Sequence, residues 1–173
     1  MYDSPVSRLP AAPLPASAQA RLVAVGRGPI NLHRSLAHAP AMLAPMLDLI
    51  HAVRYESAVA RVYREILICR IAQIEGSDYE LAHHLPMARD AGVDARQLEQ
   101  LDHWAEADCF SAAERAVLSY AEHLGTGVPW DAAGLDDHFS PAEQTELTVA
   151  GATYVAVARI LRSLEVRIDD HLR

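Results

Sequence analysis

The 173-residue sequence predicts an all-α protein, built as a single-domain helical bundle, and three observations carry this prediction. Apolar residues recur at spacings of three and four, and no segment shows the sustained alternation of a half-buried strand. Apolar residues make up 51% of the chain but aromatic residues only 6%, so the core must consist mainly of Ala, Leu, Val and Ile. Helix start and stop signals separate the apolar segments.

Residues 1–15 are predicted to form a proline-rich arm before an all-α domain over residues 16–173. Proline removes a backbone donor and favours extended backbone, so a helix is not expected in the arm. The prolines concerned are Pro5, Pro10, Pro13 and Pro15.

The first half of the domain is predicted to contain four helices. The first covers residues 16–25 and ends at Gly26 and Gly28, and the second begins near Pro40. The third covers residues 57–75, where a helical face repeats at three-and-four spacing. Its members are Val62, Glu65, Ile66, Cys69 and Ala72. Gly76 ends this helix, and the fourth runs to Gly92 with Ser77 or Asp78 as its N-cap.

The second half has well-marked helix starts. A short helix is expected over residues 94–104, with Asp94 as its cap. Ser111 to Glu114 and Ser140 to Glu143 both have the spacing of a capping box, in which a serine and a glutamate satisfy each other's backbone donors. The last helix is expected over residues 141–167.

Charge and hydropathy exclude several classes of function. The net charge of −8 and the lack of a basic tract argue against nucleic acid binding. No apolar run reaches the ~20 residues of a membrane span, and the N-terminus does not resemble a signal peptide. The two cysteines, Cys69 and Cys109, form no CxxC pair and are expected to be reduced, buried thiols of a cytoplasmic protein.

Glu65 is the first candidate site residue, because it lies on the apolar face of the predicted third helix. Burial without a partner raises the pKa of a carboxyl group and equips it for proton exchange near neutral pH. The alternative is an ion pair with Arg61, one turn earlier on the same face. Spacing does not decide between these two interpretations.

The following helix brings together a carboxylate and an imidazole. Glu80 and His84 are four residues apart, so they can hydrogen-bond, which orients the imidazole and raises its pKa. Such a pair can serve as general acid and base, although a simple surface contact has the same spacing. Tyr79 and His83 point away from that face. Ser77 and Tyr79 are candidates for hydrogen bonds to a substrate.

A metal site is not expected. Glu80 and His83 have the Glu-x-x-His spacing of di-iron helical bundles, but such sites need a second motif on another helix and none occurs. There is also no HExxH zinc pattern.

The segment from Glu65 to Gly92 resembles the carboxymuconolactone decarboxylase and alkylhydroperoxidase D-like superfamily. The peroxidase branch has a glutamate and, twelve residues later, a CxxCxxxH motif. Here Ser77 and Glu80 stand at the two cysteine positions, while His84 keeps the histidine. The sequence therefore resembles the decarboxylase-like branch that lacks the CxxC motif. The resemblance implies the alkylhydroperoxidase D-like helical fold and a homo-oligomer.

By this resemblance we expect a cofactor-free acid/base lyase that acts on a small carboxylic acid or lactone. Its pocket is expected between the helices at 57–75 and 78–91, with Glu65, Glu80 and His84 as catalytic residues. One alternative is a non-catalytic binding or oligomerisation domain that retains the fold. Peroxidase activity through Cys69 is a further alternative, disfavoured because dithiol chemistry needs a resolving thiol. The identity of the substrate cannot be inferred from the sequence.

Overall fold

Residues 6–130 and 133–173 are described in a computed structural model, and within these ranges the chain is helical, with no β-strand. The expected fold class is confirmed. The α-helices are α1 (Ala16–Ala24), α2 (Asn31–Leu36), α3 (Pro40–His51), α4 (Arg61–Ile74), α5 (Asp78–Asp90), α6 (Ala95–Glu99), α7 (Ala112–Thr126), α8 (Ala133–Asp136) and α9 (Pro141–Leu164). A π-helical turn, η1 (Ala52–Glu56), continues α3, and two 3-10 turns are η2 (Leu101–His103) and η3 (Asp170–Leu172).

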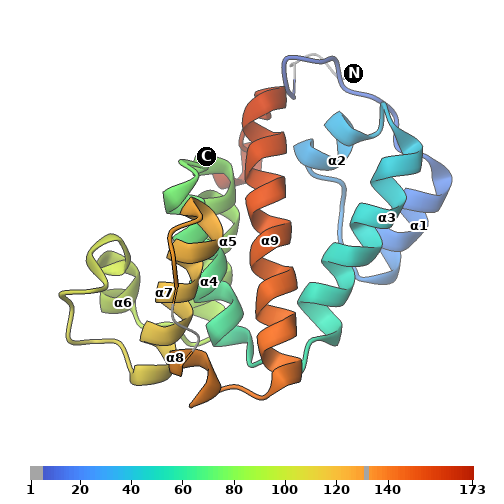
Figure 1. Ribbon diagram of the computed structural model, residues 1–173. Helices are drawn as coiled ribbons and strands as arrows, with labels where there is room; N and C mark the ends of the chain where they lie inside the picture. Colours follow the sequence, from blue (N-terminus) through green and yellow to red (C-terminus); the bar gives the residue numbers. More distant parts are fainter. Residues whose placement is uncertain (1–5, 131–132) are drawn as a thin grey trace.

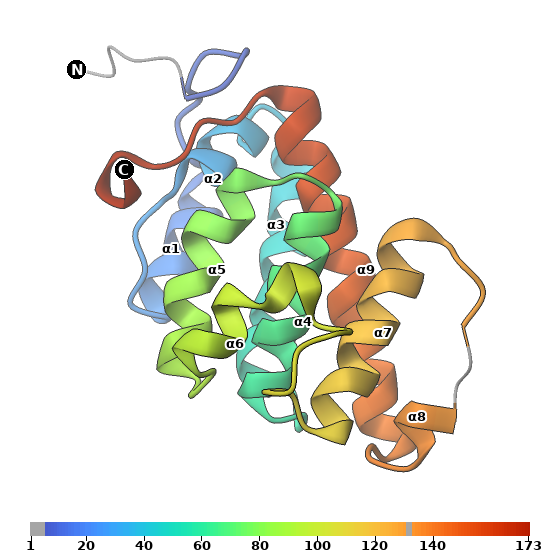
Figure 2. The ribbon, with the colours of Figure 1, turned by 90° about the vertical axis from the view of Figure 1, so that its left-hand side faces the viewer.

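Helix α4 is the centre of the bundle and packs against α5, α7 and α9 (Figures 1 and 2). One of its faces joins a core with α7 and α9 that includes Leu67, Ile71 and Leu147. Its opposite face joins a second core with α5, η2 and α7 that includes Ile66 and Cys69. Because α4 is covered on both sides, eight of its fourteen residues are buried.

The N-terminal helices α1, α2 and α3 pack together on the other side of α9 (Figure 1). Their core is made by Ala18, Leu22, Leu43 and Leu47. A smaller cluster connects this layer to the rest of the bundle, since Leu32 of α2 packs with Tyr79 of α5 and with α9. The molecule thus has two packed parts with a boundary along α5 and α9.

Helix boundaries follow the capping signals closely. Both capping boxes form, and the glutamates at 114 and 143 each return a hydrogen bond to the backbone N–H of their serine, at 2.7 and 2.9 Å. Ser77 caps α5, and Asp94 caps α6. Gly76 has φ +62°, a left-handed conformation that glycine adopts at little cost.

Four elements differ from the prediction. The helix expected over residues 94–104 is α6 (Ala95–Glu99) followed by the 3-10 turn η2 (Leu101–His103). Helix α2 was not expected, because it is only six residues long and directly follows Gly26, Gly28 and Pro29. Helix α4 begins at Arg61 rather than at 57, since Ser57 leaves the π-helical turn with extended backbone. Helix α9 ends at Leu164, three residues early, because Glu165 takes a left-handed conformation with φ 52°.

Part of the predicted N-terminal arm, residues 1–5, lies outside the described residues. Residues 6–15 contain no helix and are tied to the bundle by backbone hydrogen bonds. Arg8 N–H donates to the Leu164 carbonyl at 2.9 Å, and Arg167 N–H donates to the Val6 carbonyl at 2.9 Å.

Helix α9 is the one described helix whose length and composition would allow it to cross a bilayer. It is nevertheless a core helix in this fold. Eight of its residues are buried, among them Leu147, Ala150 and Tyr154, and they pack against α4 and α7.

Candidate functional site

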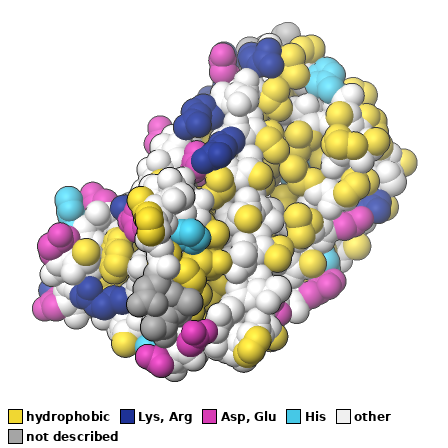
Figure 3. Space-filling view, in the orientation of Figure 1, with side chains coloured by type: hydrophobic (Ala, Val, Ile, Leu, Met, Phe, Trp, Pro, Cys, Tyr) yellow, Lys and Arg dark blue, Asp and Glu magenta, His cyan; other side chains and the backbone are white. Residues whose placement is uncertain are grey.

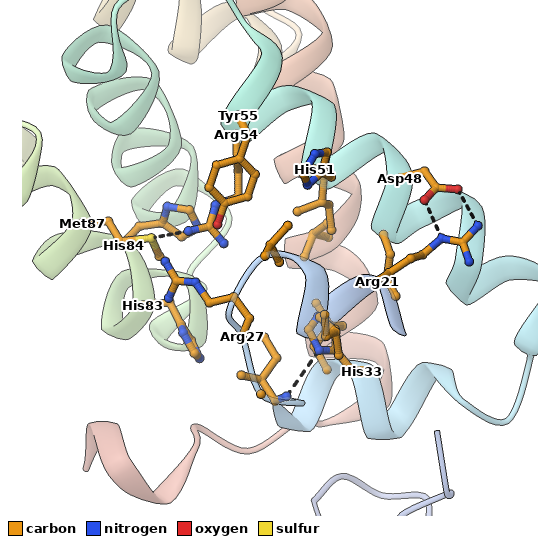
Figure 4. A pocket seen from close by; sticks show the side chains of 18 of the residues that line it. Arg21, Arg27, His33, Asp48, His51, Arg54, Tyr55, His83, His84 and Met87 are labelled. Carbon is orange, nitrogen blue, oxygen red and sulfur yellow. Dashed lines mark hydrogen bonds and ion pairs between the residues drawn. The ribbon is translucent and has the colours of Figure 1, made fainter. Parts of the chain in front are cut away.

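A cavity of about 360 Å³ lies at the boundary between the two packed parts (Figure 4). It is lined by α1, α3 and the segment between α1 and α2 on one side, and by α5 and α9 on the other. A volume of this size suits a small-molecule ligand. Its lining combines apolar side chains with charged and imidazole groups, which come from α1, α2, α3, η1 and α5.

The position of this cavity corrects the sequence-based expectation. No residue of α4 lines it, so it does not lie between the helices at 57–75 and 78–91. The reason is packing: Ile66, Cys69 and Ala88 fill the interface between α4 and α5 and leave no space for a ligand. The facing wall comes instead from the N-terminal helices.

Glu65 and His84 form a buried hydrogen-bonded pair across α4 and α5. His84 Nδ1 lies 2.9 Å from Glu65 Oε2, and both side chains are almost fully buried. A carboxylate can only accept, so the proton of the imidazole is assigned to Nδ1. Nε2 of His84 is then the basic nitrogen.

The pKa values of this pair move in the same direction. Burial disfavours ionisation of Glu65, but the hydrogen bond and charge of His84, with Arg61 and Arg54, lower its pKa below the ordinary value. Burial lowers the pKa of His84, although Glu65 opposes this shift. An ionised Glu65 beside a neutral His84 is the resulting state at neutral pH. The expectation that Glu65 would have a raised pKa is therefore wrong.

The alternative partner of Glu65 is also present. Arg61 Nε lies 3.5 Å from Glu65 Oε1, and the Arg61 side chain is 45% exposed. Such a partly solvated pair contributes little to the free energy of folding. The ion pair with Arg61 that spacing allowed is therefore present, with one carboxylate oxygen turned to Arg61 and the other bonded to His84.

Glu80 is a buried carboxyl group, and one of its oxygen atoms lacks a hydrogen-bond partner among the described residues. Glu80 is 4% exposed, and the oxygen without a partner is Oε2. Burial raises the pKa of Glu80 to about 8, while Arg54 opposes that shift. Glu80 is therefore mostly protonated at neutral pH and lines the cavity as a carboxylic acid.

Glu80 and His84 are neighbours without a hydrogen bond. His84 Nε2 and Glu80 Oε2 are 3.7 Å apart, beyond hydrogen-bonding distance. The expected rise in the pKa of His84 does not occur, because burial outweighs the effect of its carboxyl neighbours. Both side chains line the cavity, with Glu65 behind His84.

The two predicted substrate-binding residues serve the fold. Ser77 Oγ accepts a hydrogen bond from the backbone N–H of Glu80 at 3.4 Å as the N-cap of α5, and Ser77 does not line the cavity. Tyr79 lines it, but its hydroxyl donates to Asp169 Oδ2 at 2.7 Å and accepts from the Leu32 N–H at 3.3 Å. The Tyr79 hydroxyl is thus already occupied.

Asp169 forms a second carboxylate network on the other side of α5. Its Oδ2 also lies 3.1 Å from His83 Nε2, and its Oδ1 accepts from the Asn31 N–H at 2.9 Å. Burial disfavours its ionisation, but the hydrogen bonds from His83, Tyr79 and Asn31 lower the pKa of Asp169. This network fastens the C-terminal segment to α2 and α5.

Arg54 and Tyr154 lie in the cavity wall, and the sequence did not identify either of them as a candidate site residue. Arg54 lies in η1 near His84 and Met87 (Figure 4), and Tyr154 of α9 packs edge-on against the His84 ring with centroids 4.8 Å apart. Tyr154 matched an apolar helical pattern, which gave no sign of a polar role. Arg54 had no motif around it, and only the tertiary fold brings η1 to α5.

The remaining candidate groups are the thiol of Cys69 and side chains that could bind a metal ion. Cys69 is fully buried, and burial together with Glu65 and Glu80 strongly raises the pKa of its thiol. The thiolate is the reactive form, so this cysteine is held in its unreactive state. Among residues 6–130 and 133–173, no three His, Cys, Asp or Glu side chains are grouped to hold a metal ion.

The helical bundle has the alkylhydroperoxidase D-like fold. The profile of the carboxymuconolactone decarboxylase family matches residues 40–123. This match and the shared fold support the carboxymuconolactone decarboxylase and alkylhydroperoxidase D-like superfamily. The expected superfamily is confirmed.

The solved structures that superpose on this chain share its fold and carry different descriptions. YdfG of Bacillus subtilis, an uncharacterised protein, is 29% identical over 86 residues, which are 50% of this chain and 58% of YdfG. An uncharacterised peroxidase-related protein from Ralstonia eutropha, described as an alkylhydroperoxidase AhpD core, superposes with TM-score 0.83 at 20% identity, covering 98% and 95% of the two chains. The debrominase Bmp8, solved with 2,3,4-tribromopyrrole, gives TM-score 0.73 at 16% identity over 91% and 84%.

Proposed function

We propose that this protein is an acid/base lyase that acts on a small carboxylic acid or lactone in the cavity beside α5. The observation that carries the proposal is the pairing of a neutral acid with a neutral base. Glu80 retains its proton near neutral pH, and His84 offers an unprotonated Nε2 3.7 Å away. Both groups line the cavity and are shielded from bulk water.

The arrangement fits decarboxylation of a β-keto-like acid. As the carbon–carbon bond breaks, carbon dioxide leaves and the bonding electrons form an enolate. The Glu80 carboxylic acid protonates the resulting carbon and becomes a carboxylate, which regains its proton from water. Positioned general acids and bases contribute roughly 10²- to 10⁴-fold to such reactions.

Glu65 acts through His84 in this scheme. Its carboxylate holds the Nδ1 proton, which fixes the tautomer and orientation of the imidazole. Nε2 of His84 can then remove a proton adjacent to a carbonyl in a lactone, or shuttle the proton that recharges Glu80. Glu65 is a positioning residue, whereas Glu80 and His84 contact the substrate.

The test is turnover by purified protein on a panel of β-keto acids and lactones, followed by carbon dioxide release or loss of the lactone. We expect His84→Ala and Glu65→Gln to lower turnover by at least 100-fold while the helical circular dichroism is unchanged. Equal activity in the wild type and both variants would remove these residues from the mechanism.

A second candidate function is a binding or oligomerisation domain without catalysis. Two observations favour it: Glu65 is also paired with Arg61, and apolar side chains are exposed on the face formed by α9 and the N-terminal helices (Figure 3). Met42 and Val149 are 63% and 40% exposed. A second copy of the chain could cover such side chains. Under this candidate, sedimentation shows a homo-oligomer and no substrate of the panel is consumed.

A further inference from the structure

The cavity has apolar side chains on its walls and, beside α5, a cluster of buried polar groups next to an arginine. Leu22, Leu47 and Val157 contribute apolar surface. At this polar end, Arg54 lies near His84 (Figure 4), and His84 Nε2 lies 3.7 Å from Glu80 Oε2. We propose that the cavity binds an amphipathic monocarboxylate, whose negative charge pairs with Arg54 and whose apolar body lies against α1, α3 and α9. This inference rests on the proposed function, since it names the substrate class of the same site.

Arg54 is a cation without a carboxylate partner among the described residues. Its Nη2 donates to Met87 Sδ at 3.0 Å, and its guanidinium lies 5.4 Å from the centre of the Tyr55 ring. A thioether is a weak acceptor, so most of the donors of the guanidinium remain available. Arg21 lines the same cavity but is already paired with Asp48 at 2.6 Å. Arg54 is therefore better suited to receive an anion in a bidentate contact.

The charges around Arg54 favour an anionic ligand over a neutral one. Arg54 is close enough to Glu80 to act on its ionisation, yet burial keeps Glu80 protonated near neutral pH. No ionised Glu80 therefore competes for the guanidinium or repels an incoming carboxylate. When carbon dioxide leaves the substrate, the negative charge moves to the enolate oxygen and stays near the same cation.

Tyr154 supplies a neutral donor at this end. It is 4% exposed, lines the cavity, and its hydroxyl makes no hydrogen bond with residues 6–130 or 133–173. Burial strongly raises the pKa of Tyr154, so the hydroxyl keeps its proton. It can donate to a ligand oxygen beside Arg54.

The apolar walls explain why one carboxylate is favoured over two. An ionised group without a partner is costly on an apolar surface. Of the other two arginines in the lining, Arg21 is already paired with Asp48 and Arg27 is exposed in the segment between α1 and α2, so a second carboxylate gains less than the first. A hydrocarbon or aromatic body gains from the same walls in proportion to the area that it buries.

Calorimetric titration at pH 7 tests the inference without requiring turnover. The probes are phenylacetate, 3-phenylpropionate and 4-phenylbutyrate, with the alcohol of each as the uncharged control and phenylsuccinate as the dicarboxylate. We expect the affinity for the acids to rise up to about fourfold per methylene group, to exceed that of each alcohol at least tenfold, and to fall with added salt.

Variants of the cavity arginines test which cation binds the carboxylate of the ligand. Arg54→Gln should weaken binding of the acids at least tenfold and leave the alcohols within twofold, and Arg54→Lys should retain part of the acid binding. Arg27→Gln is the matched control, since it removes another cation of the cavity lining, and it should change acid binding by less than threefold. The salt dependence of the wild type tests the charge even where Arg54→Gln fails to fold.

Three results would overturn the inference: loss of acid binding in Arg27→Gln rather than Arg54→Gln, tighter binding of phenylsuccinate than of the monocarboxylates, or no acid binding at all. The last result, combined with turnover of lactones or polar acids, would leave the proposed lyase function intact. Conversely, Arg54-dependent binding without turnover of any substrate would support this inference and remove the lyase function.

Discussion

Two adjacent histidines on α5 belong to two carboxylate networks that differ in how completely they are satisfied. His83 belongs to the Asp169 network, in which one carboxylate is contacted by a hydroxyl, an imidazole and a backbone N–H. His84 belongs to the Glu65 network, where Nδ1 is bonded but Nε2 has only Glu80 as a neighbour, at 3.7 Å. One turn of α5 thus carries two networks. We call the Asp169 network closed, because its polar groups are hydrogen-bonded, and the Glu65 network open, because His84 Nε2 makes no hydrogen bond with a described residue.

The difference distinguishes a structural contact from a candidate reactive site. Asp169 has partners for both of its oxygens, and it holds the C-terminal segment against α2. Glu80 leaves a buried oxygen without a partner, which destabilises a fold unless a ligand or water satisfies the atom. The open network also faces the cavity. Unsatisfied polar atoms therefore indicate the functional side of α5 more clearly than residue type does.

The largest expected effect separates the two histidines by activity. On any substrate turned over by the wild type, His84→Gln should lower kcat/KM at least 100-fold, because it removes the basic Nε2. His83→Gln should lower it less than tenfold, since His83 is held by Asp169. Steady-state kinetics of both variants measures this difference. Equal losses would mean that the two networks work as one unit.

The next effect concerns stability. Asp169→Ala leaves the Tyr79 hydroxyl and the Asn31 N–H without their acceptor, so the free energy of unfolding should fall by about 3 kcal/mol. Asp170→Ala is the matched control: its carboxylate is 87% exposed and contacts only Arg173, so a change below ~0.5 kcal/mol is expected. Urea unfolding at pH 7 measures both values.

This stabilisation should depend on pH. The pKa of Asp169 is lowered in the fold, so its contribution is present above the ordinary carboxyl pKa and is lost as pH falls through the folded value. The difference between the wild type and Asp169→Ala should therefore shrink in acid. A difference that stayed constant below pH 3 would contradict an ionised Asp169.

The smallest effect tests the open network through Glu80. In the folded protein its pKa is about 8, above the ordinary 4.5, so between these values only the unfolded state releases the proton. Stability should consequently fall as pH rises through this window and level off above it. Glu80→Gln removes the penalty, so its advantage over the wild type should grow between pH 5 and pH 7.5 by up to about 1.4 kcal/mol per pH unit.

Thermal unfolding across this pH range measures the advantage, and each kcal/mol corresponds to roughly 2–4 °C in Tm. Glu99→Gln, an exposed carboxyl at the end of α6, serves as the control and should show no such pH dependence. A constant difference between Glu80→Gln and the wild type would indicate that Glu80 is ionised in the fold.

Local signals predicted the helices, and distant contacts decided the site. Ser111, Asp94 and Gly76 mark helix ends through bonds and dihedral angles within a few residues, which can be inferred from sequence. The partner of His84 was predicted as Glu80, at i and i+4. His84 instead donates its hydrogen bond to Glu65, nineteen residues away. Helical spacing gives the direction of a side chain but not which neighbouring helix faces it.

The sequence by itself determined the helical class, most helix boundaries and the superfamily, because these depend on periodicity, capping and a motif frame. Only the tertiary structure decided where the cavity lies, since α4 is covered on both faces and the open wall comes from α1 and α3. It also decided the protonation of Glu80 and the roles of Arg54 and Tyr154. Burial and unpaired charge are properties of the assembled bundle, and they arise only when segments distant in sequence enclose the same space.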